Sequence, residues 1–92
     1  MNFLLDTHTF IWFINGDKSL PGRVIAKIKD IENDCFFSMA SIWEIAIKMK
    51  LTKISLQSGF NKITDFCIVN EIEILPITFE HIRALNDLQL HQ

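Results

Sequence analysis

The sequence predicts an α/β fold: a three-layer α-β-α domain with a central parallel sheet and the element order βααβααβα. Short apolar runs alternate with stretches at helical spacing, which is the pattern of strands joined by crossover helices. Such crossovers are right-handed and make the strands parallel. The chain is 49% hydrophobic and has only three Gly and two Pro, so residues 1–92 read as one domain without a linker.

The first third of the chain predicts a strand followed by two helices. Residues 2–6 form a short strand that is apolar enough to be buried on both faces. Thr7 or Thr9 can cap a helix that runs to about Asn15. Pro21 opens the second helix, where its missing N–H costs nothing. The buried stripe of this second helix is expected to consist of Val24, Ile25, Ile28 and Ile31.

The middle of the chain predicts a second strand at 34–38 and a helix that Ser38 caps and that ends near Lys50. The polar face of this helix is narrow and the remaining faces are apolar, so we expect it to be largely buried. A carboxylate in such a helix needs a partner, either a metal ion or a nearby lysine. The polar face consists of Ser41, Glu44 and Lys48.

The last third predicts a loop over 51–58, a helix over 60–69 and a third strand over 71–75. Pro76 closes that strand, and Thr78 can cap a final helix with which the chain stops. The inward-facing residues of the final helix are expected to be Phe79, Ile82, Leu85 and Leu88.

Charge and cysteine content narrow the class of protein only slightly. The net charge of −2 gives no general attraction to nucleic acid, although metal ions and local lysines can still neutralise phosphates. Cys35 and Cys67 lie in apolar surroundings and are expected to be buried free thiols, as in a reducing cytoplasm. We expect a cytoplasmic protein without a leader or a membrane helix, because no apolar run is long enough for either.

Two carboxylates are the strongest indication of function. Asp6 follows a buried strand, at the edge of the sheet where open α/β folds bind ligands. Asp6 could equally do no more than cap the next helix. Glu44 lies four residues before Lys48, so the two could also form an ordinary surface ion pair. If the two acids converge, they offer oxygen ligands for Mg²⁺ or Mn²⁺.

Three segments resemble the PIN-domain family: LLDTHTFIW at 4–12, SMASIWEIAIK at 38–48 and ILPIT at 74–78. The resemblance runs through the whole chain in order and is strongest with the VapC-like toxins of bacterial type II toxin–antitoxin systems. It implies a parallel sheet flanked by helices and an endoribonuclease that depends on Mg²⁺ or Mn²⁺. It also implies an inhibitory antitoxin and a homodimer as partners.

The same resemblance implies roles for individual residues. Asp6 and Glu44 match the first two acids of the family and would hold the metal. Thr7 matches its small hydroxyl residue, either Ser38 or Ser41 matches its serine, and these hydroxyl side chains would contact the substrate. Lys48 could contact phosphate, although an ion pair with Glu44 is the simpler interpretation, and His8 stays a minor catalytic candidate.

The chain departs from the family pattern near residue 92. Relatives have a third acid in a segment that soon follows a histidine placed like His91, and a fourth acid after another strand. This chain ends at Gln92, so we expect a C-terminally truncated domain in which the strand at 2–6 is an exposed edge that pairs with another chain. An incomplete metal site favours an alternative function, a protein-interaction module that binds the antitoxin or dimerises. The basic cluster Lys48, Lys50 and Lys53 is either a solvated face or a contact for RNA or an acidic partner.

Overall fold

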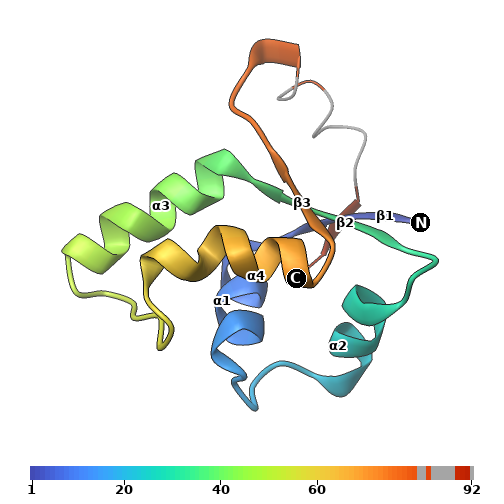
Figure 1. Cartoon of the computed structure of the whole chain (residues 1–92), viewed down its shortest axis with the longest axis horizontal. Coiled ribbons are helices and arrows are strands. Elements are labelled where there is room, and N and C mark those ends of the chain that lie inside the picture. Colours follow the sequence, from blue (N-terminus) through green and yellow to red (C-terminus); the bar gives the residue numbers. More distant parts are fainter. Residues whose placement is uncertain (81–82, 84–88, 92) are drawn as a thin grey trace.

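A four-stranded parallel sheet organises the domain (Figure 1). The computed structural model describes residues 1–80, 83 and 89–91. The strand order across the sheet is β3-β2-β1-β4. The strands are β1 (Asn2–Leu5), β2 (Asp34–Ser38), β3 (Ile72–Leu75) and β4 (Gln89–His91). The first three strands lie where the sequence predicted them, and the predicted α/β class is confirmed.

The fourth strand corrects one expectation. β4 pairs with β1 in the register Phe3↔Gln89, Leu4↔Leu90 and Leu5↔His91. The chain therefore does not stop on a helix, and β1 lies inside the sheet instead of at an exposed edge. A three-residue strand is too short to produce a recognisable alternation in the sequence. Its position is explained by the unpaired N–H and C=O groups that β1 would otherwise leave free.

The helices begin close to the predicted residues. Pro21 is the N-cap of α2, and its carbonyl accepts the N–H groups of Val24 and Ile25. Gly16 ends α1 in a left-handed conformation with φ of 64°, which glycine adopts without strain. The helices are α1 (Thr7–Asn15), α2 (Gly22–Lys29), α3 (Met39–Lys50) and α4 (Ile63–Val69), with the 3₁₀ turn η1 (Phe60–Lys62) directly before α4.

The core lies between one face of the sheet, helices α1, α2 and α4, which Figure 1 shows on the same side of the strands, and the inner face of α3. Phe10 of α1 and Phe37 of β2 are both fully buried and stack with their ring centroids 4.0 Å apart. Phe66 of α4 meets Phe10 edge-on at 5.8 Å. This aromatic contact fixes α1 over the sheet, since a pair of this kind adds about 0.5–1.5 kcal/mol to the gain from burial.

Both cysteines are buried free thiols, as predicted. Burial raises the pKa of the Cys67 thiol to about 11. Burial also raises the pKa of Cys35, and the neighbouring Asp34 carboxylate raises it further. The two thiols therefore stay protonated near neutral pH and serve as small core residues.

Two predicted core positions are wrong. Ile31 is 86% exposed because α2 ends at Lys29, two residues too early to turn Ile31 inward. Phe79 is also exposed, because residues 76–80 lead away from the sheet (Figure 1, orange). Its ring lies 6.0 Å from the guanidinium of Arg83. The other inward positions predicted for the last helix, Ile82, Leu85 and Leu88, lie outside the described residues.

Within the described part of the chain, no helix has both the length and the apolar character needed to cross a membrane.

Candidate functional site

The candidate site lies at the carboxyl end of the sheet, where two strand-to-helix junctions meet. The first junction joins β1 to α1 through Asp6. Asp6 is the N-cap of α1, and its Oδ2 accepts the backbone N–H of His8 at 3.2 Å. The predicted caps Thr7 and Thr9 are therefore wrong, and the capping role considered for Asp6 is confirmed. The Asp6 side chain keeps 31% of its surface exposed, so capping does not remove it from solvent.

The second junction joins β2 to α3 through Ser38, which caps α3 as predicted. The Ser38 hydroxyl oxygen accepts the N–H of Ala40 at 3.1 Å, and the residue is buried. A cap of this kind stabilises a helix by about 0.5–2 kcal/mol. Ser41 follows in the first turn of α3 and is half-buried. This geometry assigns Ser38 a structural task and leaves Ser41 beside it on the first turn.

Glu44 connects the two junctions. The Thr7 hydroxyl donates a hydrogen bond to Glu44 Oε1 at 2.9 Å, across 37 positions of the chain. Lys48 Nζ lies 3.2 Å from the other carboxylate oxygen, Oε2. Because Thr7 directly follows Asp6, this bond brings the Glu44 side chain to the turn that Asp6 caps. Of the predicted site residues, Thr7 and Lys48 both contact Glu44. Asp6 is the residue before Thr7 in the chain.

The charge of Glu44 is stabilised by its two partners. The hydrogen bond from Thr7 lowers the pKa of the Glu44 carboxyl, and the hydrogen bond and charge of Lys48 lower it further. Glu44 is therefore ionised near neutral pH. The side chains of Glu44 and Lys48 are 46% and 35% exposed, so their ion pair contributes only about 0.3–0.5 kcal/mol to stability. The predicted ion pair exists, and its small energy leaves Glu44 free to exchange partners.

The carboxylate ligands available at this site suit a hard cation, but only two of them are present among the described residues. Asp6 and Glu44 both present carboxylate oxygens, which Mg²⁺ and Mn²⁺ prefer. Across residues 1–80, 83 and 89–91, no group of three or more His, Cys, Asp and Glu side chains is arranged to hold a metal ion. His8 Nδ1 lies 4.0 Å from Asp6 Oδ2 and is largely exposed. The two acids could hold an ion that keeps most of its water ligands.

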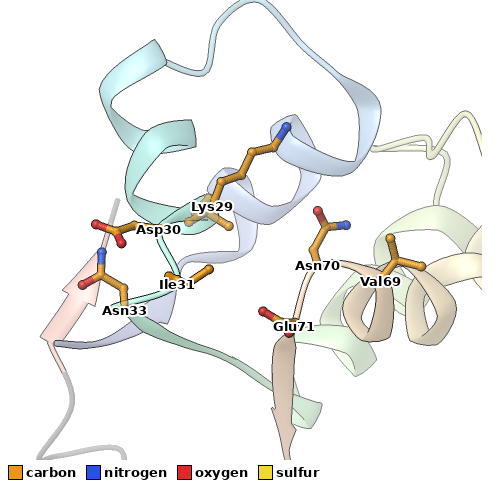
Figure 2. A pocket seen from close by; sticks show the side chains of 8 residues that line it. Lys29, Asp30, Ile31, Asn33, Val69, Asn70 and Glu71 are labelled. Carbon is orange, nitrogen blue, oxygen red and sulfur yellow. The ribbon is translucent and has the colours of Figure 1, made fainter.

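A hollow lies at the other end of the sheet, where the strands begin. Figure 2 shows Asp30, Ile31 and Asn33 on one side of it and Val69, Asn70 and Glu71 on the other. Its volume is about 280 Å³. Its polar groups serve nearby turns: Asp30 accepts the N–H of Glu32, and Asn70 donates to the carbonyl of Phe66. These groups hold loops in place instead of meeting each other, so this hollow is the weaker candidate.

Helix α3 is less buried than the sequence indicated. Only its inner face, with Ile42 and Ile45, belongs to the core, because the helix extends beyond the end of the sheet (Figure 1, green). Trp43 is 63% exposed and Ile47 is 47% exposed. The sequence signal for this exposed face is a large apolar residue at every fourth position of the helix. These four exposed residues are Met39, Trp43, Ile47 and Leu51.

Comparison with known proteins gives one match. The family model of the PIN domain matches residues 3–92. No curated protein and no solved structure matches the chain.

Proposed function

Because the chain belongs to the PIN-domain family, whose members are typically metal-dependent nucleases, we propose that it cleaves RNA phosphodiesters as an endoribonuclease. One observation carries the proposal: the Thr7–Glu44 hydrogen bond draws the second acid to the turn that Asp6 caps. The resemblance to VapC-like toxins extends the proposal to a toxin that acts on RNA in the cytoplasm and is inhibited by a cognate antitoxin.

In the proposed reaction, Asp6 and Glu44 would hold Mg²⁺ or Mn²⁺. When bound, the ion would stabilise charge on the scissile phosphate and lower the pKa of an attacking water. Thr7 orients Glu44 by occupying one carboxylate oxygen. Lys48 lies beside the other oxygen and would offer its ammonium group to the phosphate. Ser41 lies on the same helix as Glu44 and would contact the RNA, and Ser38 would hold the start of that helix in place.

A second candidate function is a protein-interaction module that binds the antitoxin or a second copy of the chain. It is favoured by the observation that the described residues place no third acid with Asp6 and Glu44. Two carboxylates alone hold Mg²⁺ weakly. The homodimer no longer follows from an exposed β1, since β4 covers that edge, and it rests on the family resemblance.

Cleavage of a single-stranded RNA by the purified chain, with Mg²⁺, with Mn²⁺ and with EDTA, separates the two functions. The nuclease proposal predicts cleavage with either metal and its loss in Asp6→Asn. Asparagine caps a helix as well as aspartate does, so this variant retains α1 while it loses a charged metal ligand. Binding of Mn²⁺, followed by electron paramagnetic resonance, should weaken in the same variant. If the wild-type chain neither cleaves RNA nor binds Mn²⁺, the interaction module is the function.

A further inference from the structure

The outer face of α3 carries an exposed aromatic ring next to the proposed site. A hollow of about 250 Å³ lies on this face, lined by Ala40, Trp43, Glu44, Ile47 and Lys48. Trp43 is its largest side chain and one of the most exposed aromatic residues in the described part of the chain. A tryptophan left in water gives up a large gain from burial, so this ring is suited to a ligand with an apolar surface.

The hollow and the candidate site share two residues. Glu44 is bonded to Thr7, and Lys48 is paired with Glu44. Consecutive residues of an α-helix point about 100° apart, so the Trp43 ring lies about a quarter of a turn around α3 from the Glu44 carboxylate. A ligand that fills the hollow therefore contacts both the Glu44 side chain and the Trp43 ring.

The charges around the hollow favour an anionic ligand. Lys48 lines it directly. Lys50 follows in the last turn of α3 and Lys53 in the loop after it, and both are exposed. Glu44 is the acid of the lining and Lys48 balances its charge, so the net positive charge beside the hollow comes from Lys50 and Lys53. The surface thus combines one flat aromatic ring with positive charge.

The size of the hollow suits a single nucleobase. Its lining spans Ala40 to Lys48, about two turns of α3. This area accommodates one flat ring, and a helix docked along α3, which would cover the whole exposed apolar row from Met39 to Leu51, is the other outcome of the test below. A nucleobase supplies the flat face, and its phosphates supply the negative charge that the lysines complement.

We propose that Trp43 is a stacking platform for an unpaired nucleobase of the RNA, one that lies beside the phosphate held at Asp6 and Glu44. Ile47 supports the base from the next turn of the helix, and Lys48 and Lys50 contact the flanking phosphates. The inference rests on the proposed nuclease function and adds Trp43 to it as a substrate contact, one that requires an unpaired base because a paired base has no free face to stack on the ring.

Binding without cleavage tests the platform separately from catalysis. An Asp6→Asn variant in EDTA is titrated with a single-stranded RNA 12-mer of mixed sequence, and Trp43 emission is followed in a Trp12→Phe background. We expect the RNA to quench this emission and the matching RNA duplex to leave it nearly unchanged. Trp43→Ala should weaken binding, measured by fluorescence anisotropy of labelled RNA, by about 5- to 100-fold. Trp43→Phe should retain most of the affinity.

Ile31→Ala is the matched control, since it removes a more exposed apolar side chain from the opposite end of the sheet. It should bind RNA like the parent. Equal affinity of Trp43→Ala and the parent would overturn the platform, even if the wild-type chain cleaves RNA. If Trp43→Ala shifts the sedimentation of the protein and leaves RNA binding unchanged, the face belongs to a protein partner. RNA binding that depends on Trp43, in a chain that never cleaves RNA, would retain the platform and refute the nuclease.

Discussion

The two ends of the sheet resemble each other in composition and differ in how their polar groups are connected. Both carry exposed carboxylates beside a hollow of similar size. At the amino end, Asp30 and Asn70 bond to backbone groups two and four positions away. At the carboxyl end, Thr7 and Glu44 bond across 37 positions. A bond of that span exists only when the fold brings two elements together.

This difference favours the carboxyl end of the sheet as the functional site. Polar groups that bond to their own turn stabilise the loop and are already satisfied. By contrast, Thr7 of α1 and Lys48 of α3 both hold the Glu44 carboxylate. These contacts fix its position relative to Asp6. Pocket volume alone does not separate the two ends, since the hollow at the amino end is slightly larger than the one on α3.

The largest expected effect contrasts one glutamate at each end. Glu44→Gln removes a charged ligand and should lower RNA cleavage by more than about 100-fold, since loss of even a supporting partner of a ligand costs about 10- to 100-fold. Glu71→Gln makes the same chemical change at the amino end and should cleave at the wild-type rate. Initial rates at saturating Mn²⁺ measure both. Similar losses in the two variants would remove the distinction between the ends.

An intermediate effect is expected from Thr7→Val, which keeps the shape of the side chain and removes its hydroxyl. Without the hydrogen bond that lowers it, the pKa of Glu44 should rise toward its ordinary value, so that its charge is lost at a higher pH as the solution is acidified. Mn²⁺ affinity should fall by about 10- to 100-fold. Carboxyl chemical shifts followed by NMR and a Mn²⁺ titration test the two effects. An unchanged Mn²⁺ affinity would show that Thr7 does not position the acid.

The smallest expected effect is one of stability at the amino end. Glu71 has a φ of 56°, a left-handed conformation that costs a side-chain-bearing residue about 1–2 kcal/mol. Glu71→Gly should relieve that strain and stabilise the fold by about 0.5–1 kcal/mol, after the greater freedom of glycine in the unfolded chain is subtracted. Glu73→Gly, inside β3, should destabilise it. Urea unfolding followed by circular dichroism compares the two, and the nuclease rate should not change in Glu71→Gly.

The sequence predicted most of the fold because its strands and helices carry local signals. Ser38 before a helical stretch and Pro21 at a helix start each mark a boundary that the structure confirms. β4 has no such signal, since three residues cannot show a period and their position depends on the free edge of β1. The buried state of α3 was overestimated because apolar residues were assumed to face inward. The exposure of a helix depends on where it lies relative to the sheet, and the sequence of the helix alone does not determine that position.

The residues of the candidate site carry signals in the sequence, and their contacts do not. Asp6, Glu44 and Lys48 are indicated by their places after a strand and on one helix face, and Thr7 by the family resemblance. The Thr7–Glu44 bond was not predicted, because it depends on the packing of α3 against α1 through the core. Ser38 was expected to cap a helix or to meet substrate, and its buried hydroxyl takes the capping role.

The cap of α1 gives the site a dynamic signature. Asp6 accepts the His8 N–H, and Thr7, between them, holds Glu44. Fraying of this single turn would release both acids at once, so the exchange of the His8 amide hydrogen with solvent reports how often the site comes apart. A cation bound to both carboxylates would resist that fraying, and its binding would be visible as slower exchange at one backbone position.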